Sequence, residues 1–99
     1  MKVNISSVHF KADQKLESFI KEKVGKLSAI YEGVLGSDVT LKVDNSEKLI
    51  NKIAEIHVSI AGKDIFAKKQ SKTFEEATDT AVEALRKQLT KHKEKMKGI

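Results

Sequence analysis

Three stretches of the chain, residues 2–7, 39–44 and 55–60, alternate apolar with polar residues, which is the pattern of half-buried β-strands. A fourth stretch, residues 65–70, follows a turn signal and is expected to form the last strand. Residues 61–64, with the sequence Ala-Gly-Lys-Asp, have the composition of a tight hairpin turn between the third and fourth stretches. The pattern predicts four short strands and leaves open which face of the fourth one points inward.

Two further segments repeat apolar residues every three or four positions, as amphipathic helices do. The first is expected to begin at Asp13, a good N-cap residue, and to end near residue 31, before Gly33. The second opens with Thr73 and Glu76 at the spacing of a capping box and is expected to reach about Lys97. Its apolar stripe consists of Phe74, Ala77, Ala81, Val82, Leu85, Leu89 and Met96.

The predicted order of elements is β-α-β-β-β-α. The first strand, the first helix and the second strand form a βαβ unit, whose crossover is right-handed in nearly all proteins, and the other strands continue as an antiparallel meander. Both helices then lie on one face of the four-stranded sheet. We expect an α/β (α+β) two-layer sandwich and a single domain over residues 1–99, because this length suffices for one domain.

The composition excludes several classes of function. Without cysteine the chain has no disulfide, no thiol nucleophile and no cysteine-based zinc site, and its three histidines are far apart in the sequence. We therefore expect no metal ion and no cofactor. No apolar run approaches the roughly 20 residues of a membrane span, and the N-terminus lacks the apolar core of a signal peptide. A soluble, cytoplasmic protein without a membrane partner is expected.

Positive charge is concentrated at the end of the second helix. The chain carries 19 Lys and Arg against 14 Asp and Glu, a net charge of +5. After Ala84 the charged residues are Arg86, Lys87, Lys91, Lys93, Lys95 and Lys97 against the single acid Glu94, which already gives this net charge. The helix dipole favours bases only in the last turn, whereas these extend over about three turns. The number of bases therefore indicates a binding role.

Helical geometry places the bases in rows beside the apolar stripe. One row consists of Lys87, Lys91 and Lys95, and the other of Arg86, Lys93 and Lys97. On the first helix, Lys26 falls at the edge of the apolar arc and Lys23 inside it. Lys23 either snorkels, its stem covering the core, or joins Lys26 and one row of the second helix in a single positive groove.

Such a surface suits the regularly spaced phosphates of a nucleic acid. Lysine acts as a compact point charge, and each phosphate that it neutralises releases counterions, so the affinity depends on salt. The chain has no Trp, one Tyr and four Phe, which is unsuitable for stacking on unpaired bases. We predict backbone recognition of folded RNA.

Three segments carry a resemblance to a known family. They are Thr-Phe-Glu-Glu-Ala at 73–77, Lys-Val-Gly-Lys-Leu at 23–27, and Ala-Leu-Arg-Lys-Gln-Leu-Thr-Lys-His-Lys-Glu-Lys at 84–95. With these segments the chain resembles, over its whole length, the ribosome hibernation promoting factors, the family that includes the ribosome-associated inhibitor A. The resemblance implies a non-catalytic inhibitor that lies between the head and body of the small ribosomal subunit. There it contacts rRNA in the tRNA/mRNA channel and silences translation in stationary phase or stress.

The resemblance also implies which bases face rRNA. By position these are Lys23, Lys26, Lys87 and Lys91, and the candidate surface as a whole adds Arg86, Lys93 and Lys95. Ala84 departs from the family, whose members often have Lys there, and Lys95 on the same flank is the candidate replacement. The chain looks like the short form, without a dimerisation domain, and is expected to be monomeric when free. The sequence does not indicate whether the protein helps to pair ribosomes into dimers.

Three other interpretations compete with this one. A generic double-stranded-RNA-binding module grips phosphates at the start of its last helix, where this chain has Glu75, Glu76 and Asp79. A membrane-surface or partner-binding helix is disfavoured because the apolar stripe is rich in Ala and lacks Trp.

The third alternative is a small acylphosphatase-like enzyme, which needs an Arg in a Gly-containing loop to cradle an anion. The only Arg, Arg86, is expected in mid-helix, and Gly25 is interpreted as a helix-packing residue. His9, His57 and His92 have no carboxylate or hydroxyl partner nearby in the sequence and are interpreted as surface or strand residues. We expect no catalytic residue and no small-molecule substrate.

Overall fold

The computed structural model describes residues 1–97 and contains four strands and two α-helices. In chain order these are β1 (Lys2–Ser7), α1 (Gln14–Gly25), β2 (Val34–Val43), β3 (Lys52–Ile60), β4 (Lys63–Ser71) and α2 (Phe74–Lys97). A short 3₁₀-helix, η1 (Lys26–Ala29), continues directly from α1. The predicted order β-α-β-β-β-α is confirmed.

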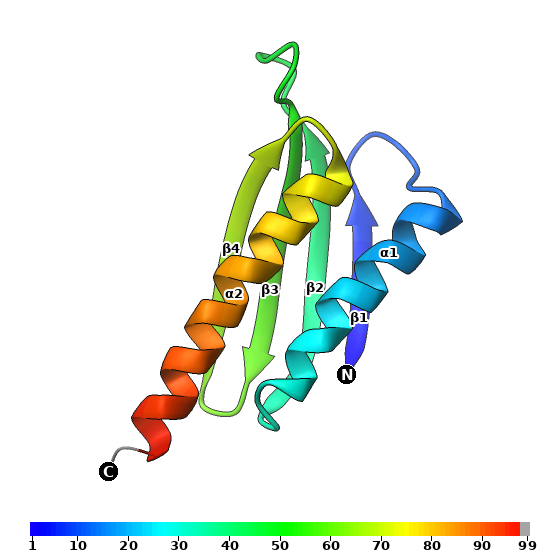
Figure 1. Cartoon of the computed structure of the whole chain (residues 1–99). Coiled ribbons are helices and arrows are strands. Elements are labelled where there is room, and N and C mark those ends of the chain that lie inside the picture. The colour runs from blue at the N-terminus through cyan, green and yellow to red at the C-terminus, as the bar shows by residue number, and fades with distance from the viewer. Residues whose placement is uncertain (98–99) are drawn as a thin grey trace.

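The strands form one mixed sheet in the order β1-β2-β3-β4. β1 pairs with β2 in parallel, with Ile5 opposite Val39, whereas the two other pairings are antiparallel. Figure 1 shows both helices on the same face, α1 in front of β1 and β2, and α2 in front of β3 and β4. The two-layer sandwich with both helices on one side is therefore confirmed.

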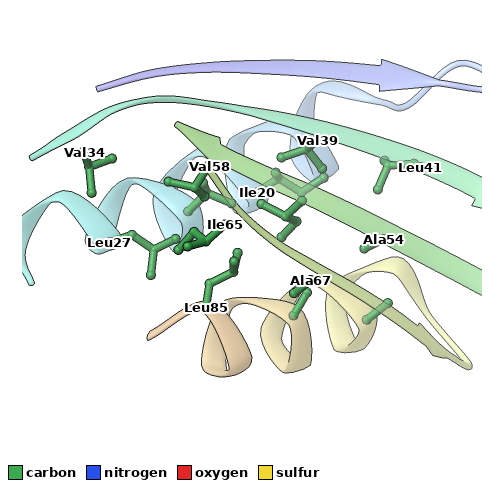
Figure 2. Close-up of a cluster of buried hydrophobic side chains, with 14 of the residues drawn as sticks. Ile20, Leu27, Val34, Val39, Leu41, Ala54, Val58, Ile65, Ala67 and Leu85 are labelled. Atoms are coloured by element: carbon green, nitrogen blue, oxygen red, sulfur yellow. The ribbon is translucent and has the colours of Figure 1, made fainter. Parts of the chain in front are cut away.

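The core lies between the sheet and the helices (Figure 2). Strand alternation directs one set of side chains toward the helices: Val39, Leu41, Ala54, Ile56, Val58, Ile65 and Ala67. The helices contribute Ile20, Val24, Leu27, Leu85 and Leu89, all fully buried. The inward face of β4, which the sequence left open, is thus the one that carries Ile65 and Ala67.

Both helices begin where the sequence predicts. The carboxylate of Asp13 accepts a 2.8 Å hydrogen bond from the backbone N–H of Leu16. The hydroxyl of Thr73 accepts a 3.0 Å bond from the backbone N–H of Glu76. Each side chain satisfies an N–H that has no partner within its own helix, which fixes the first turn.

The end of the first helix differs from the prediction. The α-helix stops at Gly25, well before residue 31, and the chain tightens into η1. Gly25 is a poor helix former, and the hydroxyl of Ser28 donates a 2.8 Å bond to the Gly25 carbonyl, in competition with the backbone ladder. The packing role expected for Gly25 is also wrong, because a Cβ placed there would meet nothing within 4 Å.

The strands of the central hairpins are longer than their alternation predicts. β2 begins at Val34, opposite Ile60, and a bulge separates this pair from the pairing of Gly36 with Ser59. The turn between β3 and β4 is shorter than expected, since Lys63 already pairs with Ile60. Within this turn Gly62 has a φ of +88°, a conformation that favours glycine.

Candidate nucleic-acid interface

A groove runs between the first helical segment and α2. Its charged lining consists of Lys23 from α1, Lys26 from η1, and Asp79 and Arg86 from α2. Leu27, Ile30 and Val82 form its apolar part, and its volume is about 280 Å³. The structure therefore brings Lys23 and Lys26 together with one base of the second helix, as the helical spacing suggested.

Lys23 fits both of the interpretations of its side chain that the sequence left open, covering apolar surface and joining the groove. Its side chain is only 34% exposed, and its ammonium lies 5.6 Å from the centre of the Phe19 ring, so the stem covers apolar surface. Its Nζ nevertheless reaches the groove and lies 3.4 Å from a carboxylate oxygen of Asp79. Lys23 is thus a groove residue whose stem packs on the helix.

Asp79 is the groove residue that the sequence interpretation missed, because it was assigned to the acidic first turns of α2. It lies seven residues before Arg86, about two helical turns, and therefore on the same side of the helix. This spacing was the available signal. The groove as folded holds three bases and one acid.

The other row of α2 does not enter the groove. At about 100° per residue, the flank with Gln88, Lys91 and Lys95 is turned away from the flank of Arg86. The side-chain amide of Gln88 donates a 3.1 Å hydrogen bond to the carbonyl of Phe66, which places this flank along β4.

Lys87, the third lysine of this row, points outward between the two flanks. All three lysines of the row are exposed, and among the described residues none of them forms a salt bridge.

The remaining bases of α2 differ in their surroundings. Arg86 is 62% exposed, and its guanidinium lies 3.8 Å from the carboxylate of Glu83. Lys93 is half-buried and follows Arg86 by seven residues on the flank that faces the first helix. The side chains of Lys97 and Met96, which the sequence assigned to a basic row and to the apolar stripe, lie outside the described residues.

Ala84 is half-buried and packs against the core. Lys95 shares its azimuth but lies eleven residues farther along the chain, about 16 Å along the helix axis. A lysine at that distance reaches a different part of any bound partner. The geometry thus separates Lys95 from the position that Ala84 leaves without a base.

One protein family matches nearly the whole chain. The family described as Sigma 54 modulation protein / S30EA ribosomal protein matches residues 3–97. This chain belongs to that family. The ribosome hibernation promoting factor of Pseudomonas putida is 31% identical to it over 99 residues, which cover all of this chain and 93% of that protein. The resemblance found in the sequence to the ribosome hibernation promoting factors is therefore confirmed.

Two solved structures share the fold of this hibernation-factor chain. A ribosomal subunit interface protein from Coxiella burnetii superimposes with a TM-score of 0.83 at 17% identity, covering 94% of this chain and 98% of that one. The N-terminal domain of Protein Y from Thermus thermophilus gives a TM-score of 0.80 at 19% identity, covering 93% and 99%. At these identities the likeness concerns the arrangement of the strands and helices.

The ribosome hibernation promoting factors are not enzymes, which sets aside the acylphosphatase-like alternative. Of the three histidines, His57 lies 3.2 Å from Asp64 on the sheet face opposite the helices, with both side chains about half exposed. His92, interpreted from the sequence as a surface residue, is instead half-buried, and its ring meets that of Tyr31 edge-on at 5.2 Å. Within residues 1–97 no three His, Asp or Glu side chains gather as a metal site would require.

The sheet face opposite the helices of this hibernation-factor chain carries paired charges. Glu55 lies 3.0 Å from Lys42 and 3.8 Å from Lys68. The amide of Asn4 donates a 3.1 Å bond to Asp38. Lys42 and Lys68 are therefore both close to the carboxylate of Glu55 on this face. Neither described helix has the apolar length that a membrane crossing requires.

Proposed function

We propose that this chain binds the small ribosomal subunit in the tRNA/mRNA channel, contacts the rRNA backbone with its helical layer, and thereby inhibits translation in stationary phase or stress. The observation that carries the proposal is the convergence of Lys23, Lys26 and Arg86 on one groove between the helices. Membership of the hibernation-factor family supports the ribosome as the partner.

The two flanks of α2 divide the candidate surface into two contact lines. Lys23, Lys26, Arg86 and Lys93 form the line toward the first helix, and Lys87, Lys91 and Lys95 form the outer line. A helix with its side chains is about 10–12 Å across. Because the minor groove of A-form RNA is wide and shallow, α2 contacts the phosphates of both strands of an rRNA helix at once.

The chemistry of these bases favours the sugar-phosphate backbone over the base edges. Six of the seven are lysines, which act as point charges rather than as bidentate donors. The single arginine lies beside Glu83. Binding therefore follows the shape of folded rRNA and weakens steeply with added salt, because each neutralised phosphate releases counterions. Acting on ribosomes, the protein works in the cytoplasm, and it is a monomer when free.

A generic double-stranded-RNA-binding module fits the structure less well. In such modules the bases that grip phosphate lie at the start of the last helix, whereas Glu75 and Glu76 occupy the first turn of α2. Carboxylates at this position repel phosphate. The bases of this chain lie at the other end of the same helix.

The test is co-sedimentation of the purified protein with small ribosomal subunits over a series of salt concentrations. We expect binding at low salt that falls steeply as salt rises. The groove variant carries Lys26→Glu and Arg86→Glu. Its control carries Lys15→Glu and Lys21→Glu, which change the net charge equally at exposed positions of α1 outside the groove.

The groove variant is expected to lose binding, and the control is expected to retain most of it. Equal losses in both variants would mean that net charge, rather than the groove, drives association. Failure of the unmodified protein to sediment with the subunits at low salt overturns the proposed function.

A further inference from the structure

Asp79 is an unexpected residue in a groove proposed to bind a polyanion. Its carboxylate lies among the three bases Lys23, Lys26 and Arg86, where it repels any phosphate that they attract. An acid at this place lowers the affinity for phosphate alone. Its presence therefore requires an explanation other than phosphate binding.

Stability does not supply that explanation. The carboxylate of Asp79 lies 3.4 Å from Nζ of Lys23, and the side chains are 54% and 34% exposed. Exposed ion pairs of this kind contribute little to the free energy of unfolding, because water screens them and both side chains lose freedom. Asp79 also does not belong to the buried core of the protein.

The rest of the groove indicates what Asp79 contacts. The apolar residues Leu27, Ile30 and Val82 line the groove together with the charged groups. The groove measures about 280 Å³, close to the roughly 300 Å³ at which pockets for small molecules begin. The cations, the apolar carbons and the single carboxylate of this lining match the three parts of a nucleotide backbone: the phosphate, the sugar ring and its hydroxyl.

We propose, on the basis of the proposed function, that this groove binds a ribose-phosphate unit and that Asp79 reads its 2′-hydroxyl. Lys26 and Arg86 contact the phosphate, the sugar lies on the apolar part, and the carboxylate of Asp79 accepts a hydrogen bond from the 2′-OH. Lys23 has several N–H donors, so it contacts Asp79 and the phosphate together and holds the carboxylate in place. DNA lacks this hydroxyl, and Asp79 then only repels its backbone. The acid thereby makes the groove selective for RNA.

The experiment compares three hairpins of one sequence: RNA, DNA, and RNA with 2′-O-methyl groups, which remove the donor but keep the A-form shape. Binding is measured by fluorescence anisotropy at low salt for the unmodified protein and for Asp79→Ala. Glu75→Ala is the matched control, because it removes an exposed acid of the same helix outside the groove. Lys23→Ala tests a base of the groove.

We expect the unmodified protein to bind the RNA hairpin about tenfold more tightly than the 2′-O-methyl hairpin, since a hydrogen bond to a charged acceptor is lost. Asp79→Ala is expected to reduce this ratio to near one by weakening RNA binding, and separately to strengthen DNA binding because a repulsive charge is removed. Glu75→Ala should keep the ratio. Lys23→Ala should weaken the binding of all three hairpins.

Two results overturn the inference. One is an unmodified protein that does not distinguish the RNA from the 2′-O-methyl hairpin. The other is an Asp79→Ala variant that binds all three hairpins more tightly by the same factor, which would make Asp79 only a repulsive charge. Co-sedimentation with small subunits is scored separately. An unmodified protein that sediments with the subunits but does not distinguish the RNA from the 2′-O-methyl hairpin rejects this inference and leaves the proposed function standing.

Discussion

The side-chain amide of Gln88 donates a 3.1 Å hydrogen bond to the backbone carbonyl of Phe66. The bond joins the middle of α2 to β4, one of the two edge strands of the sheet. It adds one polar contact to the apolar packing that sets the rotation of the helix about its axis. The direction in which the two basic flanks point therefore depends in part on one uncharged side chain.

Gln88→Ala is expected to lower the free energy of unfolding by about 0.5–1.5 kcal/mol, the usual net contribution of one hydrogen bond. Urea denaturation measures this change. Thr90→Ala, at an exposed position of the same helix, is the control, with an expected change within about 0.5 kcal/mol. Equal stability of the two variants would show that the bond to Phe66 does not hold the helix.

Gly33 lies against the ring of Tyr31. A Cβ at Gly33 would come within 2.7 Å of Cζ and 2.8 Å of the hydroxyl oxygen of Tyr31, and His92 contacts the same ring edge-on. Gly33→Ala is expected to lower the free energy of unfolding by about 1–3 kcal/mol through overpacking. In a Tyr31→Ala background the same substitution should cost less. A double-mutant cycle measures the difference, and additive costs contradict the prediction.

Two other glycines are expected to respond to alanine in opposite directions. Gly62 has a φ of +88°, where a Cβ costs about 1–2 kcal/mol, so Gly62→Ala should destabilise the fold. Gly25 has a φ of −59° and open space around it, so Gly25→Ala should stabilise the fold by about 0.5–1 kcal/mol. Thermal or urea unfolding of both variants checks the signs, and the same sign in both contradicts the prediction.

Asp44 makes the long loop between β2 and β3 sensitive to acid. Hydrogen bonds from the hydroxyl and backbone N–H of Ser46 and from the amide of Gln70 hold the pKa of its carboxyl below the ordinary value. A carboxyl whose pKa is lower in the folded state stabilises that state above its ordinary pKa. The stabilisation is lost as the pH falls through the lowered value, hence below about pH 4.

Asp44→Asn should therefore be less stable than the unmodified protein near neutral pH, and the difference should shrink below about pH 4. Urea unfolding at several pH values measures it. A difference that stays constant with pH would show that the charge of Asp44 contributes nothing to the loop.

The outer row of α2 is expected to act in binding rather than in folding. Lys87→Glu together with Lys91→Glu should abolish co-sedimentation with small subunits, because both lysines are exposed and, within residues 1–97, form no salt bridge. The melting temperature should change by no more than a few degrees, as exposed charge changes cost under about 0.5 kcal/mol each. Lys11→Glu with Lys48→Glu is the matched control at exposed positions elsewhere. Unfolding of the test variant would give these lysines a structural role.

The parts of the fold that could be predicted are those that local sequence encodes. The caps at Asp13 and Thr73, the turn at Gly62 and the alternation along the strands each depend on a few neighbouring residues. The ends of elements depend on distant partners. β2 starts at Val34 because Ile60 is there to pair with it, which no pattern within residues 34–43 reveals.

In the groove, too, some features follow from local sequence and others depend on distant residues. The spacing of the bases on their own helices sufficed to offer a shared positive groove as one of two interpretations of Lys23, and the structure places Lys23, Lys26 and Arg86 in one groove. The contact of Lys23 with Asp79 depends on how the two helices are rotated relative to each other, and that rotation is set by the core beneath them. For the same reason the sequence could not show which basic row of α2 turns away from the groove.

The length of α2 has a geometric consequence of its own. With 24 residues the helix is about 36 Å long, and Figure 1 shows its C-terminal end extending past the turn between β3 and β4. Among the described residues, Leu89 is the last fully buried side chain along it. His92 still packs on the ring of Tyr31, so only the last turn beyond it forms a narrow projection, one helix thick, on a body of 23 by 18 Å in cross-section. Lys95 can consequently enter a crevice too tight for the domain that carries it.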